Sequence, residues 1–298
     1  MLAPPAGAHG VGAGVFGFLS TRDARALRLV SSMCCADVRA ARWLDAKTCI
    51  TGPLAAWRAC FPGARAAYVA RRLTGADFVH LAGVTTLNVG GCTGITDAGL
   101  AHLTGIHALI VWRCEGVTDA GLAHLTGIHT LDVSDCAGIT DAGLAHLRGI
   151  RTLNMSGCTG VTDAGLAHLT GIRALTMWRC RIADAGLAHL RGIHALHLGW
   201  CPGITDAGLA HLRGVHTLDM WACAGVTDAG LAHLAGIHTL NMNYCTRVTA
   251  AGLAHLRGIH ALSMHGCDGI ADVSAAHLRG TLGAQATVHP WWAVGPPD

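Results

Sequence analysis

Lysine, glutamate and long apolar runs are scarce in this sequence. Lys47 is the only lysine and Glu115 the only glutamate among 298 residues, so the positive charge is almost entirely arginine. The codon usage of a GC-rich genome is the simplest explanation for this preference for arginine over lysine. The formal net charge of +3 is too small to indicate a nucleic-acid-binding protein by itself. No apolar run reaches the roughly 18 residues of a transmembrane helix, so we expect no membrane span.

Aromatic residues are also few. They make up 5% of a chain that is 51% hydrophobic, so a folded core must consist of aliphatic side chains and cysteine. The 13 cysteines are an odd number, and nine of them share one position of a repeated unit. A column of free thiols fits this pattern better than a disulfide framework. We therefore expect a reducing compartment, either the cytoplasm or the nucleus.

One unit recurs through most of the chain, and its cysteines are spaced 22 residues apart with a single spacing of 21. They are Cys92, Cys114, Cys136, Cys158, Cys180, Cys201, Cys223, Cys245 and Cys267. A fixed period of this length indicates a solenoid. The unit resembles the leucine-rich-repeat template at Ile128, Leu131, Val133, Cys136 and Ile139. The predicted fold is α/β, a horseshoe-shaped leucine-rich-repeat solenoid of about nine to ten repeats over residues 74–278.

Each repeat predicts a short strand, a turn and a short helix. In one copy, Leu109 and Val111 face the core while the residues between and beside them face outward. Cys114 turns inward, where its S–H can donate to a backbone carbonyl of the turn. Thr118 caps a helix of one or two turns, and Gly127 ends it. Strands then line the inside of the arc and helices the outside.

The repeat that contains Cys180 is irregular. It is one residue shorter than its neighbours, and Ala183 stands where the other copies have the capping threonine. Loss of such a cap costs about 1 kcal/mol unless Asp184 replaces it. We expect a local kink or a looser helix there.

Histidine recurs in two columns of the repeat. One column lies in the helix, as at His102, and the other precedes the strand, as at His107, where two copies carry Arg151 and Arg173 instead. Stacked imidazoles could sense pH or bind a metal ion. Duplication of one residue explains them more simply, because the repeat places no carboxylate or thiol partner beside them. The thiols form a line, whereas zinc requires a tetrahedron, so we expect no metal site and no cofactor.

The copies differ mainly at the outward strand positions and at the residue before the cysteine. Tryptophan, tyrosine and arginine recur there, and these side chains dominate binding energy in protein interfaces. A stripe of them on the concave face predicts a site for a target protein. The alternative is drift at solvent positions, which favours small polar residues over indoles. The candidate binding residues are Trp112, Arg113, Asp132, Asp135, Trp178, Arg179, His197, Trp200, Asp219, Trp221 and Tyr244.

Catalysis and nucleic-acid binding are the other classes of function to weigh. We find no set of nucleophile, base and orienting residue and no phosphate-binding loop, so we expect a protein that is not an enzyme. Single-stranded RNA could stack on the tryptophans beside Arg113 and Arg179. Acidic residues on the same face and the lack of a basic groove argue against nucleic acid.

Residues 15–50 differ from the repeats and contain two helical patterns. Phe16-Gly17-Phe18-Leu19, Asp23, Leu27-Arg28-Leu29-Val30 and Trp43 resemble an F-box, and the chain as a whole resembles an F-box/leucine-rich-repeat protein. This resemblance implies docking on a Skp1-like adaptor, and through it on a cullin, in a ubiquitin ligase whose target protein the repeats hold. The implied adaptor-binding residues are Phe16, Phe18, Leu19, Leu27, Leu29 and Val30. The alternative is a helical cap on a stand-alone binding solenoid.

The remaining segments complete the expected domain organisation. We expect residues 1–14 to be a disordered leader, 51–73 a linker with a degenerate first repeat, and 279–298 a C-terminal cap or tail. Val288, Trp291 and Trp292 are candidates to cover the last repeat. Outside a ligase complex we expect a monomer.

Overall fold

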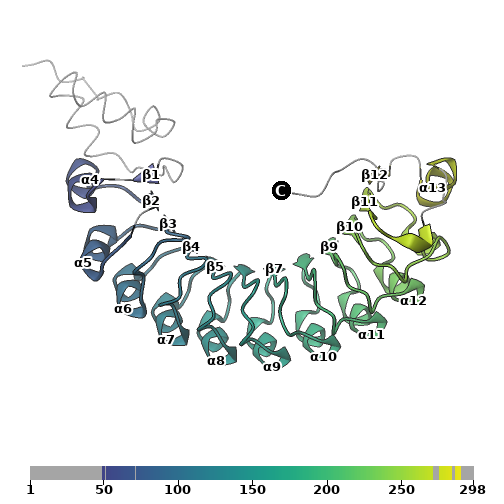
Figure 1. Ribbon diagram of the computed structural model, residues 1–298, viewed down its shortest axis with the longest axis horizontal. Helices are drawn as coiled ribbons and strands as arrows, with labels where there is room; N and C mark the ends of the chain where they lie inside the picture. Colours follow the sequence, from purple (N-terminus) through teal and green to yellow (C-terminus); the bar gives the residue numbers. More distant parts are fainter. Residues whose placement is uncertain (1–48, 51, 71, 271–274, 284–285, 290–298) are drawn as a thin grey trace, which may run out of the picture.

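A computed structural model describes residues 49–50, 52–70, 72–270, 275–283 and 286–289. Within these ranges one parallel sheet of 12 strands runs in sequential order. The sheet bends into an open arc with the strands inside and the helices outside, which confirms the predicted α/β horseshoe (Figure 1). The strands are β1 (Cys49–Ile50), β2 (Ala66–Val69), β3 (Thr86–Asn88), β4 (Ala108–Ile110), β5 (Thr130–Asp132), β6 (Thr152–Asn154), β7 (Ala174–Thr176), β8 (Ala195–His197), β9 (Thr217–Asp219), β10 (Thr239–Asn241), β11 (Ala261–Ser263) and β12 (Thr287–His289).

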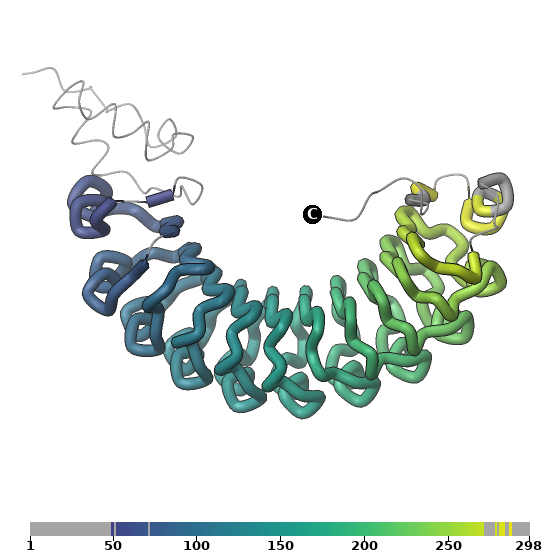
Figure 2. Tube along the Cα trace, in the orientation of Figure 1, coloured from purple at the N-terminus to yellow at the C-terminus, as the bar shows by residue number. Residues whose placement is uncertain are grey.

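Short helices return the chain along the outside of the arc, and Figure 2 follows this coil from one end to the other. The α-helices are α4 (Leu54–Cys60), α5 (Gly75–Phe78), α6 (Asp97–Leu100), α7 (Asp119–Leu122), α8 (Asp141–Leu144), α9 (Asp163–Leu166), α10 (Asp184–Leu187), α11 (Asp206–Leu209), α12 (Asp228–Leu231) and α13 (Ala275–Leu282). The 3₁₀ segments are η1 (Val79–Leu81), η2 (Ala101–Leu103), η3 (Ala123–Leu125), η4 (Ala145–Leu147), η5 (Ala167–Leu169), η6 (Ala188–Leu190), η7 (Ala210–Leu212), η8 (Ala232–Leu234), η9 (Gly252–Leu256) and η10 (Asp268–Ile270).

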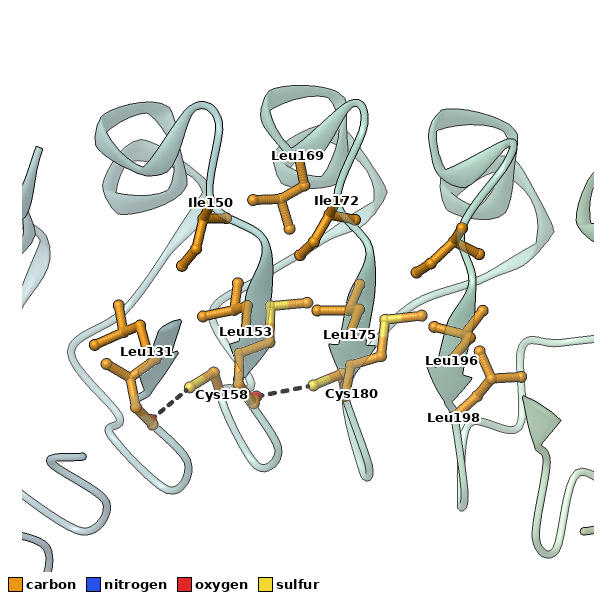
Figure 3. Packing of buried hydrophobic residues seen from close by; sticks show 14 of the residues in the cluster. Leu131, Ile150, Leu153, Cys158, Leu169, Ile172, Leu175, Cys180, Leu196 and Leu198 are labelled. Atoms are coloured by element: carbon orange, nitrogen blue, oxygen red, sulfur yellow. Dashed lines mark hydrogen bonds between the residues drawn. The ribbon is translucent and has the colours of Figure 1, made fainter. Parts of the chain in front are cut away.

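The core is a set of columns in which each repeat adds one residue to each column. Leu131 pairs in register with Leu109 on one side and with Leu153 on the other, and all three are buried. Figure 3 shows the leucine column, with Leu153 and Leu175 beside Ile150 and Ile172 from the turn that precedes each strand. Val111 is also fully buried, as the alternation of side chains predicts, although the strand itself ends at Ile110. Each repeat therefore buries its aliphatic face against its two neighbours.

The cysteines form a buried column inside the turn that follows each strand, as the repeat predicts. Cys158 is fully buried, and its S–H donates to the Val133 carbonyl at 3.2 Å. Cys180 bonds Met155 in the same way, at 3.3 Å (Figure 3). This acceptor lies in the preceding repeat, next to the end of its strand. Each thiol therefore links two neighbouring repeats. Cys114, Cys180 and Cys201 also meet a carbonyl of their own turn, as the sequence predicted, at 3.6 Å, 3.7 Å and 3.8 Å.

A carboxylate ladder on the helical side joins the repeats a second time. Asp119 of α7 accepts hydrogen bonds from the backbone N–H of Thr140 at 2.8 Å and from its hydroxyl at 2.5 Å. The same pair of bonds recurs along the array, at Asp97–Thr118, Asp141–Thr162, Asp184–Thr205, Asp206–Thr227 and Asp228–Thr249. The sequence indicated only that each aspartate suits the positive end of its own helix. Where Ala250 replaces the aspartate, the α-helical turn is missing and only η9 forms.

Glycine in each helix leaves room for this ladder. A Cβ atom placed on Gly143 of α8 would collide with the Asp119 carboxylate and lie 3.0 Å from Leu122. The corresponding glycines of the neighbouring repeats meet the preceding aspartate in the same way. Glycine is therefore required here by the close approach of two repeats, despite its poor helix propensity.

The repeat that contains Cys180 keeps the common geometry. Helix α10 has the four residues of its neighbours, and β7 and β8 pair without a shift, with Ala174 opposite Ala195. The predicted kink or looser helix is wrong. The Ala183 side chain provides no cap, but its backbone N–H still donates to Asp163 at 2.8 Å. The ladder from the preceding repeat thus holds the helix start in place.

The array extends beyond the predicted solenoid at both ends. Residues 51–73, expected to be a linker with a degenerate first repeat, contain β2, which pairs with β3, and also α4, whose Leu54 and Trp57 are buried. At the other end, β12 pairs with β11 and continues the sheet. Residues 1–48, which contain the expected leader and the F-box-like residues, lie outside the described residues, as do Trp291 and Trp292.

Candidate functional site

Most of the predicted binding residues lie at the carboxyl edge of the sheet, in the turn that follows each strand, while Asp132, His197 and Asp219 are the last residues of their strands. Trp112, Trp178 and Trp221 occupy the first position of this turn. The next position has a left-handed backbone in every repeat from β4 to β10, with φ between 55° and 59° at Arg113, Asp135, Arg179, Trp200, Ala222 and Tyr244, and 71° at Gly157. Most of the candidates therefore lie along one rim of the arc, at the edge of the concave face where the sequence predicted a binding site.

The left-handed turn position is one that favours glycine. Glycine does occupy it in three copies, at Gly91, Gly157 and Gly266. A side chain there costs roughly 1 kcal/mol of local strain. Trp200 and Tyr244 nevertheless carry large rings at this position. Strain retained at an exposed turn is typical of a functional site, because the side chain does not contribute enough to stability to explain it.

Five side chains from consecutive repeats form what we call the aromatic cluster: Trp178, Trp200, Trp221, Tyr244 and His265. The Trp221 ring lies at its centre, with its centroid 6.3 Å from Trp178, 5.4 Å from Trp200 and 5.7 Å from Tyr244. Tyr244 in turn meets His265 edge-on at 5.2 Å. Trp178 is 37% exposed, Trp200 55% and Tyr244 41%, so the outer rings of the cluster face solvent.

Small residues let the rings of the cluster lie flat against the neighbouring turns. A Cβ atom on Gly266 would lie 2.6 Å from the Tyr244 ring. Gly199 leaves space between Trp178 and Trp221, whose nearest atoms would be 3.6 Å and 3.4 Å from a Cβ there. Glycine is therefore needed at position 266, whereas a Cβ at Gly199 would make ordinary contacts. The rings contact one another before any partner binds, which lowers the entropy cost of binding.

Two predicted binding residues prove to be supports of the turn. Asp219 is only 8% exposed, and its carboxylate accepts the Trp221 backbone N–H at 3.0 Å. Its second oxygen lies 3.7 Å from Nδ1 of His197, which would be an ion pair when the imidazole is protonated. Asp132 accepts from the backbone N–H and the hydroxyl of Ser134, at 2.9 Å and 2.6 Å. Asparagine at the same place in other copies makes the same bond and was the available signal.

A smaller exposed group lies three repeats before the cluster. The Trp112 indole lies over Gly90, where any Cβ would collide with it. The Arg113 guanidinium lies 5.6 Å from the Trp112 ring centroid, and its Nε is 3.3 Å from the Asp135 carboxylate. Exposed pairs of this kind contribute little stability. Serine occupies the first turn position of the two repeats that separate this group from the aromatic cluster.

Arg179 is the last of the candidate binding residues, and the buried thiols are the remaining candidates for metal ligands. Arg179 is exposed in the turn between Trp178 and Cys180. Burial raises the pKa of the Cys158 and Cys180 thiols to about 12, so these sulfurs are protonated and poor ligands at neutral pH. Among the residues that the structure describes, no three histidine, cysteine or acidic side chains are grouped to hold a metal ion.

Within the described part of the chain, no helix has the length and apolar character needed to cross a bilayer.

Comparisons with known proteins agree with this architecture. A family model described as Leucine Rich repeat matches residues 84–103 and 124–147. The structure is similar to internalin C2 from Listeria monocytogenes, at 25% identity over 64% of this chain and 84% of that one, with a TM-score of 0.50. It is also similar to internalin inlF from the same organism, at 18% identity over 72% and 68% of the two chains and a TM-score of 0.54.

A third similar structure is that of the TLR13–ssRNA13 complex, at 13% identity over 78% of this chain and 41% of that one, with a TM-score of 0.54. At such identities these likenesses concern the fold. No curated protein matches the sequence. Strand register, repeat length, buried pattern and family match together identify the described chain as a leucine-rich-repeat solenoid, an architecture that serves as a scaffold for protein interactions.

Proposed function

We propose that this protein is a non-catalytic binding scaffold whose aromatic cluster holds a partner protein. The observation that carries the proposal is the contiguity of the rings: Trp178, Trp200, Trp221 and Tyr244 come from consecutive repeats and contact one another while three of them stay exposed. Tryptophan and tyrosine supply most of the binding energy where a partner covers them. Isolated exposed rings would need no such explanation.

The turn chemistry supports the same conclusion. A left-handed backbone at Trp200 and Tyr244 is costly for side chains that do not fill the core. Three other copies carry glycine at this position, where the left-handed backbone has no such cost. The smaller group of Trp112, Arg113 and Asp135 offers a second contact of mixed charge on the same rim. A partner protein that reaches both would run along the carboxyl edge of the sheet.

We further propose that the scaffold brings its partner protein to a ubiquitin ligase. The resemblance of residues 15–50 to an F-box supports a role as a substrate receptor, in which these residues bind a Skp1-like adaptor of a cullin-RING ubiquitin ligase. The single lysine of the chain would then limit ubiquitylation of the receptor itself. Such a receptor would act in a reducing compartment, the cytoplasm or the nucleus, as a monomer until it joins the ligase.

Co-purification with a Skp1-like adaptor and a cullin tests this part of the proposal. Replacing Phe18, Leu27 and Val30 by alanine should abolish recovery of the adaptor and leave partner capture intact. Replacing Trp200 and Tyr244 by alanine should have the opposite effect. A matched control changes Thr104 and Thr126 to alanine on the outer side of the arc, and both interactions should survive it.

A stand-alone scaffold is the alternative, and the same experiment separates it from a ligase receptor. If the unaltered chain recovers its partner but never the adaptor or cullin, the link to ubiquitin ligases is wrong and the binding scaffold stands. If the Trp200 and Tyr244 variant keeps its partner at full affinity, the aromatic cluster is not the binding surface.

A further inference from the structure

The opposite rim of the arc carries a second ordered surface, which we call the basic column. It consists of the eight residues that directly precede strands β4 to β11, from His107 to His260. Six are histidine, and Arg151 and Arg173 fill the two central places. The backbone N–H of each residue donates to the carbonyl of the preceding one, for example His216 to His194 at 3.0 Å. The column therefore follows the amino edge of the sheet without a gap.

The imidazole rings of the column contact one another. The centroids of His107 and His129 are 4.8 Å apart and their planes differ by 4°. At the other end, the ring of His216 lies 4.7 Å from that of His194 and 4.4 Å from that of His238. His238 continues to His260 at 4.6 Å. The rings thus stack at the spacing of the strands, which leaves mainly their nitrogen-bearing edges for a ligand.

In the ranges that the structure describes, the loops beside the column supply no compensating negative charge. The loops that lead into it, from residues 103–108 to residues 256–261, hold no aspartate or glutamate, and four of them add an arginine: Arg148, Arg191, Arg213 and Arg257. Arg191 and Arg213 contact the helix histidines His211 and His233 of the next repeat, at 3.4 Å and 3.3 Å. On the strand side the neighbours are alanine and threonine, and Thr239 Oγ1 lies 3.1 Å from His238 Nδ1.

The acidic residues of the repeats are occupied elsewhere. The helix aspartates bond the threonine of the next repeat on the convex side, and Asp132, Asp135 and Asp219 lie at the carboxyl rim. Protons on adjacent rings therefore repel one another, and no acidic side chain of the described loops balances them. Partial desolvation, and the charges that His216 and His260 would carry, lower the pKa of His238. An anion along the column would remove that repulsion and so would favour proton uptake.

We propose that the basic column binds an acidic polypeptide segment, and that this binding tightens as the pH falls through the histidine range. Carboxylates accept hydrogen bonds from imidazolium and guanidinium N–H groups, and both kinds of donor lie along this rim. Nucleic acid fits less well, because the ring faces are stacked on one another and offer no platform for bases. A bilayer fits less well because the isoleucines of these loops, such as Ile150 and Ile237, are buried.

Fluorescence anisotropy with a labelled oligo-glutamate peptide tests the proposal on the full chain. Binding should be at least about tenfold tighter at about pH 5.5 than at about pH 7.5, on either side of the ordinary histidine pKa. Replacing four of the six column histidines by asparagine should reduce the pH dependence strongly; these are His194, His216, His238 and His260. The matched control replaces four helix histidines by asparagine and should bind as the unaltered chain does; these are His102, His124, His146 and His168.

Calorimetry on the unaltered chain gives a second readout that does not depend on how the variants fold. The binding enthalpy of the oligo-glutamate peptide, measured in buffers of different ionisation enthalpy near pH 6.5, should show net proton uptake. Affinity that is independent of pH, an absence of proton uptake, or equal losses in the column variant and its control would each overturn the proposal. So would tighter binding of an oligouridylate or of phosphatidylserine vesicles at matched charge, because the ligand class would then be wrong.

Discussion

The helical side of the solenoid and the carboxyl rim of its sheet differ in how much their residues vary from one repeat to the next. On the helical side nearly every repeat carries the same aspartate, glycine and leucine, and each contacts the next copy through the carboxylate ladder. On the rim the copies diverge, from glycine at position 157 to Trp200 and Tyr244. The difference lies in what each side chain touches, since rim residues share few contacts with the core.

This contrast separates residues that hold the array together from residues that give it a specific surface. A side chain bonded to both neighbours cannot change in one copy without leaving a partner unsatisfied, and an unsatisfied buried group costs about 1–3 kcal/mol. A rim residue can change alone. The rim is therefore where one duplicated unit can acquire a binding site without loss of stability.

The thiol column gives the largest expected effect, since it runs through the repeated, buried part. Burial raises the pKa of Cys114, Cys158 and Cys223 to about 12, against an ordinary value of 9.0. A raised thiol pKa means that the folded state keeps its protons while the unfolded state loses them. The stabilisation is complete below pH 9.0 and is lost as the pH rises towards about 12.

Guanidinium unfolding at a series of pH values measures this loss. The free energy of unfolding should fall steeply above the ordinary thiol pKa, by up to about 1.4 kcal/mol per pH unit for each thiol. Replacing Cys158 and Cys223 by alanine should make the fall shallower. A slope that these substitutions leave unchanged would show that the thiols do not cause the alkaline loss.

Filling one ladder glycine should have the next largest effect. Gly143→Ala would push a methyl group into the Asp119 carboxylate, and we expect it to cost about 3 kcal/mol of unfolding free energy. Gly149→Ala is the control: its Cβ would meet nothing within 4 Å, although its φ of 83° is strained for alanine. That control should cost only about 1 kcal/mol. Equal costs in chemical denaturation would mean that close approach does not set the residue at position 143.

The sequence alone predicts the helical side better than the rim, for a physical reason. Period, inward leucines and inward cysteines depend on the alternation and spacing of residues within one repeat, which the sequence displays directly. The bond from Asp119 to Thr140 joins two copies, so a single repeat cannot reveal it. Outward exposure of Trp200 was predictable, but its place on the rim depends on a left-handed turn that one sequence does not indicate.

Asp219 is a second residue whose role at the candidate site could not be predicted from its own repeat. Its position predicts an exposed residue available to a partner, yet it is buried beneath the turn and accepts the Trp221 N–H. An aspartate or asparagine two residues before a turn amide often makes this bond, so the information was present in the repeated asparagines. The exposed rings therefore remain the stronger candidates for contact with a partner.

Restoring a threonine cap to helix α10 should change the free energy of unfolding less than filling the glycine, and should increase it. Ala183→Thr would supply a hydroxyl that can accept from the Ala185 N–H, as Thr118 accepts from Ala120 at 3.3 Å, and donate to Asp163. We expect a gain of about 1 kcal/mol in unfolding free energy. In an Asp163→Ala background the gain should fall to about half, because one of the two new bonds is lost. An undiminished gain would mean that the ladder takes no part in capping α10.

Trp200→Gly should have the smallest effect on stability and so tests the rim side of the contrast most directly. The substitution removes the contact of the ring with Trp221 but relieves the left-handed backbone at φ 58°, and glycine already serves at Gly157 and Gly266. Because these changes oppose each other, the free energy of unfolding should move by less than about 0.5 kcal/mol. The control Leu196→Ala, fully buried in the same repeat, should cost about 3 kcal/mol. If both variants were destabilised alike in thermal and chemical unfolding, the Trp200 ring would be part of the structural core, and its exposure could no longer be assigned to binding.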